Sequence, residues 1–286
     1  NITEDFEISG SLTIPQTVKL TIADHAVSVA SGAVLTNLGL IRVTGTGALT
    51  IAGTLENSGK TELYNGATLD ASAGTYTDPT KINLLVEDEG ATGICTVSGV
   101  PAASIAYKRN VSSETDLAAA LISADNGYRR ADVNVKGAFS LTSDVTIPAN
   151  VNLTVLSTLI IDAGVKLTVN GALCVALLNT LILNGSIENN GSIQVQGTLT
   201  MNGTITGNGY IDNPGTAKTE ADLRAALAAG KSTIGIEGSF ALSADLTIPS
   251  YATLYLEGYT LTVPSGKTLQ IDGGIELNIV GDTLGR

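Results

Sequence analysis

The chain has 286 residues, 32 glycines, no tryptophan and a formal net charge of −12 at pH 7. This acidity argues against nucleic acid as a partner, because phosphate binding needs clustered Lys and Arg side chains. No uninterrupted apolar run approaches the ~18 residues that would cross a membrane, so we expect no membrane insertion. A composition rich in Gly, Thr, Asn and Val is typical of β-structure.

One stretch occurs three times, at residues 6–15, 139–148 and 240–249. Each copy opens on one of the three Phe residues, runs to Leu-Thr-Ile-Pro or Val-Thr-Ile-Pro, and is followed by a second apolar pair. Shared spacing over three copies indicates an internal repeat. We predict that Phe6, Phe139 and Phe240 cap or fill the first coil of their copies.

Residues 11–75 contain short apolar pairs separated by Gly, Asn and Ser, and the two members of a pair stand two residues apart. That spacing puts both side chains on one face of a strand. The pattern returns after 21 residues at three positions: Ile14 to Leu35, Leu20 to Ile41, and Ile22 to Val43. A coil that closes at this interval is typical of a parallel β-helix.

The apolar pairs also define a predicted core. Side chains expected to point inward are Leu12, Ile14, Leu20, Ile22, Val145, Ile147, Leu153, Val155, Leu246, Ile248, Leu254 and Leu256. The second copy repeats the first beyond the Phe stretch, since 53–59 and 185–191 are nearly identical. The third copy is shorter.

Residues 76–112 fit no coil in this pattern. Residues 81–86 predict a strand, and Glu87-Asp88-Glu89 predicts a solvated acidic turn. We therefore interpret this segment as an irregular insert at the first module boundary.

Two helices are predicted, near 113–126 and 219–229. In each, a Ser or Thr stands three residues before an Asp, which resembles a capping box, and Ala and Leu follow. Gly127 and Gly230 suit the exits. Leu117 with Leu121, and Leu223 with Leu227, share a helix face that we expect to cover the open end of the coil that follows.

These elements predict an all-β fold, a parallel β-helix in two to three repeated modules. The expected divisions are 1–75, the insert 76–112, 113–218 and 219–286. The alternative is one continuous β-helix.

The order helix, strand, Phe stretch, Leu-Thr-Ile-Pro and Leu-x-Leu resembles the start of the pectate-lyase-like superfamily of right-handed parallel β-helices. The resemblance covers 219–258 best and 113–155 almost as well. The Gly-x-Leu-x-Asn-x-Gly turns look like those of bacterial surface and adhesin-type β-helix repeat proteins. The resemblance implies a right-handed coil with a capping helix and leaves the activity open.

Polysaccharide lyases on this fold need carboxylates gathered around Ca²⁺ and a nearby base. Here Asp70, Asp162, Asp212 and Asp272 are scattered, and we interpret them as corner residues. The repeated Glu56-Asn57 and Glu188-Asn189 also predict corners, because Asn tolerates the left-handed conformation. His25 is the only histidine. We therefore predict no catalytic residue, no metal site and no cofactor.

Two further features stay structural in this interpretation. Repeated Asn residues, at positions 57, 65, 179, 189, 202 and 208, predict stacked amide ladders inside the coil. Cys95 and Cys174 allow one disulfide, and the sequence leaves open whether it forms.

One group of residues suggests ligand binding. Tyr251, Tyr255 and Tyr259 fall together in the third copy, where the other copies have mostly small or polar residues. Exposed aromatic rings can stack on the apolar faces of sugars. The alternative is that these Tyr pack on the neighbouring helix or line a contact between modules.

The expected protein is a non-catalytic, extracellular or cell-surface β-helix that acts in adhesion, glycan binding or spacing. The alternative is a polysaccharide lyase or hydrolase of the pectate-lyase-like fold. The expected partner is a polysaccharide or a host or cell-surface glycan, and the oligomeric state is left open. No signal peptide is visible at Asn1, so the location is inferred from the resemblance.

Overall fold

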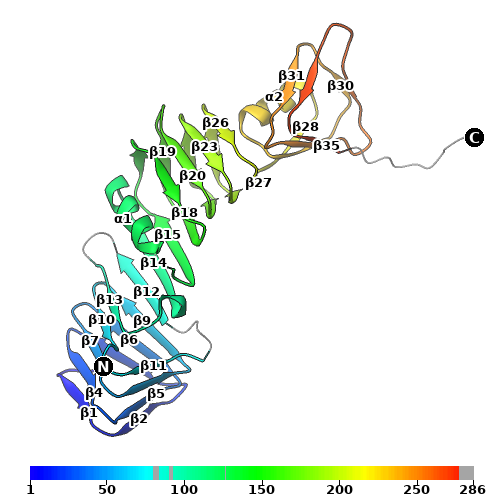
Figure 1. Cartoon of the computed structure of the whole chain (residues 1–286). Coiled ribbons are helices and arrows are strands. Elements are labelled where there is room, and N and C mark those ends of the chain that lie inside the picture. The colour runs from blue at the N-terminus through cyan, green and yellow to red at the C-terminus, as the bar shows by residue number, and fades with distance from the viewer. Residues whose placement is uncertain (80–83, 90–92, 126, 277–286) are drawn as a thin grey trace, which may run out of the picture. The chain divides into compact units, whose positions relative to one another are not determined.

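The computed structural model describes residues 1–79, 84–89, 93–125 and 127–276. Over these residues the protein is a parallel β-solenoid of about 12 turns with two short α-helices (Figure 1). The predicted all-β, parallel β-helix fold is therefore confirmed. The chain divides into two compact units, Asn1–Gly137 with Asn150–Leu153, and Ala138–Ala149 with Thr154–Arg286. The division passes through β18 (Val151–Val155). The module boundaries predicted from the repeats remain a prediction.

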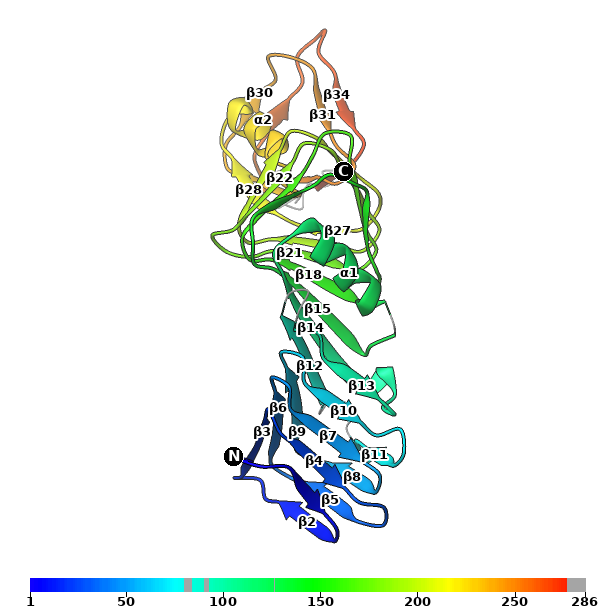
Figure 2. The same ribbon diagram turned by 90° about the vertical axis from the view of Figure 1, so that its left-hand side faces the viewer.

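The first unit is built from three parallel sheets, whose strands lie side by side in Figure 2. One sheet contains β1 (Phe6–Ile8), β4 (Ala26–Val29), β7 (Ala48–Ile51), β10 (Thr68–Asp70) and β13 (Thr96–Ser98). A second contains β2 (Ser11–Ile14), β5 (Val34–Asn37), β8 (Thr54–Asn57) and β11 (Thr75–Thr77). The third side contains β3 (Lys19–Ala23), β6 (Leu40–Thr44), β9 (Lys60–Tyr64), β12 (Leu84–Glu89), β14 (Ile105–Val111) and β15 (Arg130–Val135).

The strand register confirms two of the three predicted coil steps. Leu20 pairs with Ile41 and Ile22 with Val43. The third step is wrong, because Ile14 pairs with Asn37, and Leu35 pairs with Leu12. The corner between β2 and β3 holds four residues, 15–18, whereas the corner between β5 and β6 holds only Leu38 and Gly39. Two extra residues in the first corner therefore shift the register on one side only.

The predicted core is largely buried, with Ile14, Ile22 and the inward residues of the second copy shielded from solvent. Leu12 is the clear departure, because it is 40% exposed, and Phe6 is exposed as well. Leu12 pairs with Leu35 and Phe6 pairs with Val27, and both of these partner residues are buried. They lie on β2 and β1, which are the last strands in their sheets, so only one neighbouring strand covers them. Phe139 and Phe240 are half-buried.

The expectation that 76–112 fits no coil is wrong for its described strands. β12 pairs in parallel with β9 on one side and with β14 on the other, and β13 pairs with β10. The short 3-10 helix η1 (Ala102–Ser104) leads into β14. The predicted acidic turn at 87–89 lies within β12, and Asp88 points inward and is buried. The run of acidic residues predicted a solvated turn, but the Asp88 carboxylate can be buried because it accepts hydrogen bonds from polar groups inside the coil.

The second unit is also built from parallel strands, and its last turns form three sheets of their own. One sheet contains β16 (Phe139–Leu141), β19 (Thr158–Ile161), β22 (Thr180–Leu183) and β25 (Thr198–Met201). A second sheet contains β17 (Val145–Ile147), β20 (Lys166–Val169), β23 (Ser186–Asn189) and β26 (Thr204–Thr206). The third side contains β21 (Ala172–Val175), β24 (Ser192–Val195) and β27 (Tyr210–Asp212). The last turns contain β28 (Pro214–Ala217), β29 (Thr233–Ile236), β30 (Phe240–Ala241), β31 (Leu246–Ile248), β32 (Thr253–Tyr255), β33 (Leu261–Thr262), β34 (Leu269–Ile271) and β35 (Gly274–Glu276).

The repeated Gly corners have a steric reason. A Cβ on Gly53 would lie 2.2 Å from the Ala33 carbonyl oxygen, and one on Gly185 would lie 2.2 Å from that of Val165. No real Cβ tolerates such a contact with backbone, so both corners demand glycine. The near-identity of 53–59 and 185–191 therefore reflects the close stacking of successive turns.

The predicted Glu-Asn corners are wrong in detail. Asn57 and Asn189 end strands β8 and β23, and their side chains are buried. Asn37 Nδ2 donates to Asn57 Oδ1 at 2.7 Å, and Gly191 N donates to Asn189 Oδ1 at 3.2 Å. These Asn side chains bond the corner from inside, which satisfies buried backbone groups without a left-handed conformation.

Both predicted helices form, as α1 (Glu114–Ala124) and α2 (Glu220–Ala228). Ser113 accepts from Asp116 N, and Thr219 with Asp222 forms a complete capping box. α1 packs on β14 and β15. Leu223 and Leu227 of α2 are buried in one cluster with residues of the following coil, as expected for a covering helix.

Candidate functional site

A cleft of about 470 Å³ opens on the second unit, where three successive turns of the solenoid meet. Its lining is Gly207, Asn208, Gly209, Tyr210, Ile211, Ser232, Thr233, Ser250, Tyr251, Thr253 and Tyr255. Two of the three predicted ligand residues, Tyr251 and Tyr255, are thus brought together. Tyr259 is 45% exposed and is not among the described residues that line the cleft.

Tyr210 is the aromatic residue that the repeat comparison missed. It begins β27, is 69% exposed, and is one of the residues that line the cleft. The turn before it is fixed by Gly207, which has a φ of +95° and whose Cβ would lie 2.1 Å from the Asn189 carbonyl oxygen. The Gly-Asn-Gly run marked this turn in the sequence, but only the stacking of turns places Tyr210 near Tyr255.

Tyr251 and Tyr255 are held differently. Tyr251 is half-buried, packs against the core beneath α2, and its hydroxyl donates to the Leu227 carbonyl oxygen at 3.1 Å. Burial raises the pKa of this hydroxyl above its ordinary value, so it remains a neutral donor. Tyr255 lies on β32 between buried Leu254 and Leu256 and turns outward, as predicted from the alternation. The alternative prediction, that these Tyr side chains pack on the neighbouring helix, therefore holds for Tyr251.

The scattered carboxylates stay apart. Asp70 accepts from the hydroxyls of Ser72 and Ser98, which lower its pKa to about 2. Asp212 accepts from Gln194, and Asp272 from Gln270. Within the described residues, no three His, Cys, Asp or Glu side chains come together as a group that could hold a metal ion.

A buried polar cluster lies in the first unit, in the segment that the sequence marked as irregular. Arg109 and Asp116 form an ion pair with side chains only 1% and 6% exposed. Asp88 accepts from Tyr107 Oη at 3.0 Å and from Cys95 N at 2.8 Å, and the Tyr107 ring stacks on Tyr128. Among the buried side-chain nitrogen and oxygen atoms of the described residues, only Arg109 Nε lacks a hydrogen-bond partner. We therefore interpret the cluster as part of the internal packing of this unit.

The remaining candidate residues are the two cysteines and the single histidine. Cys95 and Cys174 are both free thiols, and burial raises the pKa of the Cys95 thiol to about 11. His25 Nδ1 lies 3.7 Å from the carboxylate of Asp5 at the surface. Among the described helices, none is both long and apolar enough to cross a bilayer.

The comparisons with known proteins give no family for this chain. Neither the models of protein families, nor the curated proteins, nor the solved structures contain a match to it. The β-solenoid architecture is consequently established by the strand pairing alone.

Proposed function

We propose that this protein is a non-catalytic, extracellular or cell-surface β-helix that binds a glycan through the cleft between Tyr210, Tyr251 and Tyr255. The observation that carries the proposal is the convergence of three aromatic side chains from two turns on one cleft of about 470 Å³, with Tyr210 on one turn and Tyr251 and Tyr255 on the other. Sugar recognition uses aromatic rings against apolar sugar faces together with nearby hydrogen-bonding groups.

The polar lining of the cleft supports the same ligand class. Asn208, Ser250 and Thr253 offer amide and hydroxyl groups beside the rings. Among the described residues that line the cleft there is no Lys or Arg, and the chain carries a net charge of −12. A neutral polysaccharide or glycan therefore fits better than an anionic one. The extracellular or cell-surface location follows from this ligand class and from the resemblance to surface β-helix proteins.

The rival function is a polysaccharide lyase or hydrolase of the pectate-lyase-like superfamily. The parallel β-solenoid and the covering helix α2 favour that resemblance at the level of fold, which does not carry activity with it. Incubation of the chain with pectate, with and without Ca²⁺, separates the two. Unsaturated products that absorb in the ultraviolet would replace the binding proposal with the enzymatic one.

The binding proposal is tested by a glycan array followed by titration of the strongest neutral polysaccharide. We expect Tyr210→Ala and Tyr255→Ala to weaken binding, with thermal unfolding measured by circular dichroism unchanged for the exposed Tyr210. Tyr259→Ala is the matched control, because this exposed Tyr lies four residues beyond Tyr255 and outside the cleft.

Two results would contradict the cleft. The first is that the unmodified protein binds no glycan on the array, which would exclude glycan binding as its function. A Tyr259→Ala variant that loses binding while Tyr210→Ala keeps it would place the platform on the outward row predicted from the sequence, away from the cleft.

A further inference from the structure

Among the described residues, one sheet of the second unit and its corners contain no charged side chain. The sheet contains β16, β19, β22 and β25. Together with the corners that lead into its last three strands, it covers residues 138–141, 156–161, 176–183 and 196–201. None of these residues is Asp, Glu, Lys, Arg or His, although the chain has 15 Lys and Arg and 27 Asp and Glu. We call this surface the uncharged face; Lys136, Asp144 and Asp162 stand outside it along the chain.

The uncharged face carries exposed and half-buried apolar side chains. Ile160 on β19 pairs with Ile182 on β22. Both side chains are half-buried and point outward, because the residues on either side of them in each strand point into the core. The corners add Leu156, Leu177 and Leu178, whose exposed fractions are 40%, 67% and 93%. A single exposed leucine needs no explanation, but several on a face without charge are typical of a surface that another molecule covers.

The corner that carries Leu177 and Leu178 is longer than its neighbours. It holds four residues, 176–179, between β21 and β22. The corner one turn earlier, 156–157, and the corner one turn later, 196–197, hold two residues each. The additional residues make the longer corner project, and the exposure of Leu178 places that side chain at its tip. We call 176–179 the projecting corner and 156–157 the short corner.

The backbone of the projecting corner is unusual for a leucine. Leu178 has a φ of +68°, in the left-handed region. The corners of the first unit that lead into β4, β7 and β10 put Asp24, Gly45 and Asn65 in that region, with φ values of +59°, +64° and +55°. Gly, Asn and Asp adopt this conformation readily, whereas the Cβ of a leucine comes too close to the following carbonyl oxygen. Neither local conformation nor core packing therefore accounts for a leucine at this exposed position.

We propose that the uncharged face binds a second copy of this chain in a symmetric dimer, with Leu177 and Leu178 at the centre of the contact. The two shapes that such a contact needs lie one turn apart on the same surface: the projecting corner, and the short corner with Leu156. About a two-fold axis, the projecting corner of each copy packs over the short corner of the other, so each contact occurs twice.

The charge of the molecule favours the same partner. Each copy has a net charge of −12, so most pairs of surfaces from two copies repel each other. At the uncharged face, two copies can meet without placing like charges opposite one another. A basic partner would find no acidic side chain among the described residues of this face, so charge complementarity does not favour such a partner.

The size of the face sets the expected affinity. Its strands have three or four residues each. Four such strands at ~4.8 Å spacing cover only a few hundred Å², whereas a standard interface buries about 800 Å² per partner. We therefore expect a weak dimer, with a dissociation constant of about 10–100 µM. Added salt should strengthen it, because salt screens the repulsion between the two net charges and leaves an apolar contact intact.

Sedimentation velocity of the whole chain, from about 5 to 500 µM at low and high NaCl, tests the dimer. We expect the parent to pass from monomer to dimer over this range, and to do so at lower concentration in high salt. Leu178→Asn should weaken association by about tenfold or more. Asn tolerates the left-handed conformation, so this variant should unfold at a temperature no lower than the parent. Leu156→Ser should also weaken association, because it alters the short corner.

Two variants serve as controls. Ile122→Ser removes an equally exposed apolar side chain, since Ile122 is 75% exposed on α1 of the first unit, outside the uncharged face. Tyr210→Ala changes the glycan cleft, and no described residue that lines the cleft belongs to the uncharged face. Both variants should dimerise like the parent, so failure of the glycan proposal and failure of the dimer are distinguishable.

A parent that stays monomeric at about 500 µM in both salt concentrations would overturn the dimer. A Leu178→Asn variant that associates like the parent would do the same, and association unchanged by Leu156→Ser would contradict packing over the short corner. Flotation with phosphatidylcholine vesicles provides one further outcome. Vesicle binding by a monomeric parent, abolished by Leu178→Asn, would assign the face to a lipid surface and overturn the dimer.

Discussion

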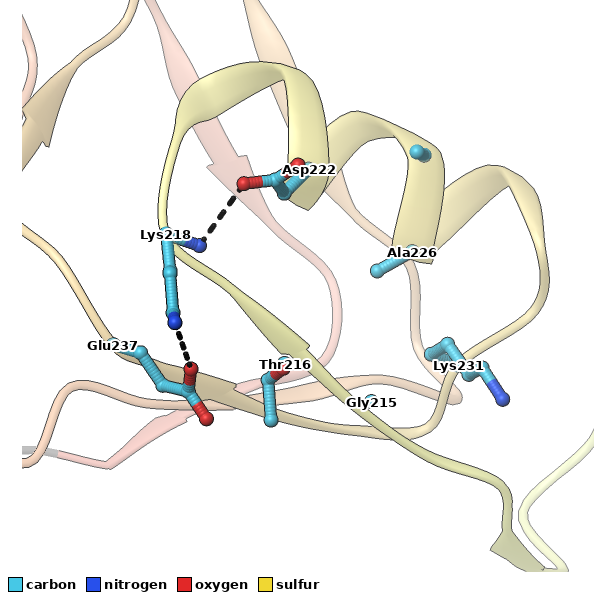
Figure 3. Close-up of a pocket in the computed structure, with 8 residues that line it drawn as sticks. Gly215, Thr216, Lys218, Asp222, Ala226, Lys231 and Glu237 are labelled. Atoms are coloured by element: carbon cyan, nitrogen blue, oxygen red, sulfur yellow. Dashed lines mark hydrogen bonds and ion pairs between the residues drawn. The ribbon is translucent and has the colours of Figure 1, made fainter.

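The chain has two helix crossovers, in which α1 connects β14 to β15 and α2 connects β28 to β29, and they are packed differently. α1 buries Asp116, Leu117, Ala120, Leu121 and Ala124, whereas α2 buries only Leu223 and Leu227. On the strand beneath each helix, four residues before the N-cap, stands Arg109 in one crossover and Gly215 in the other. Arg109 pairs with Asp116 of α1. In the second crossover the Lys231 side chain packs over Gly215 (Figure 3). The two helices thus join equivalent strands but are buried to different extents.

A buried ion pair is not in itself a stabilising feature. Removing two charges from water costs several kcal/mol per ion, and the attraction between them roughly offsets that cost. Breaking such a pair is different, because the remaining charge stays buried without a partner. The first crossover is therefore expected to be sensitive to loss of either partner and tolerant of loss of both.

The largest expected effect comes from Arg109→Met. The change leaves the Asp116 carboxylate buried and unpaired, so we expect the free energy of unfolding of the first unit to fall by about 3–5 kcal/mol. The measurement is urea unfolding followed by circular dichroism, with hydrogen exchange of α1 and β14 to assign the loss to this unit. The double variant Arg109→Met with Asp116→Leu should recover most of the loss.

Arg42→Met is the matched control for that prediction. Arg42 Nη2 lies 2.6 Å from Glu62 Oε2 in a pair that is partly exposed, so its removal should cost about 0–1 kcal/mol. An Arg109→Met variant as stable as Arg42→Met would mean that the difference between the crossovers does not rest on the buried pair.

A smaller effect is expected from the helix caps, which the two crossovers share. Ser113→Ala and Thr219→Ala each remove the acceptor for the N–H of an Asp at the third helical position, at 3.2 Å in both cases. Each should cost about 1 kcal/mol, measured by hydrogen exchange of the helix concerned. If Ser113→Ala proved as costly as Arg109→Met, the cap would replace the ion pair as the source of the difference.

The smallest effects depend on pH and have opposite signs in the two units. Burial raises the pKa of Asp88, so its neutral form favours the folded state; that contribution is present below about pH 4 and is lost as the pH rises through the folded-state pKa. Bonds from Ser243 and Arg224 lower the pKa of Glu220 to about 2, so its contribution is present at neutral pH and is lost as the pH falls below about 4.5.

Asp88→Asn and Glu220→Gln test these signs. Hydrogen exchange is followed between pH 3 and pH 7 in parent and variants, after correction for the intrinsic rate. Relative to the parent, Asp88→Asn should gain protection around β12 toward neutral pH, and Glu220→Gln should lose protection around α2 toward neutral pH. The same sign in both variants would contradict the assignment of opposite charge states.

The sequence by itself determined the elements that depend on local pattern. The apolar pairs two residues apart predicted the strands, and the Ser/Thr-x-x-Asp runs predicted both helices. The threefold Phe stretch predicted an internal repeat, and the return of the apolar pattern after 21 residues predicted a parallel β-helix. These features are readable because each depends on neighbours close in the chain or on one repeated spacing. The near-identical corners at 53–59 and 185–191 were readable as a repeat, but the reason for their glycines is the backbone of the preceding turn, which leaves no room for a Cβ.

Only the tertiary structure decided which residues from different turns meet. Pairing of β12 with β14 buries Asp88, although three successive acids are more often solvated, because Tyr107 and the Cys95 amide supply partners. Tyr210 joins Tyr255 because successive turns stack, and no repeat comparison aligns those two positions. Gly215 and Arg109 take the same place because the strand register aligns them. Nothing in their local sequences shows that Arg109 is buried against Asp116, or that the Lys231 side chain packs over Gly215.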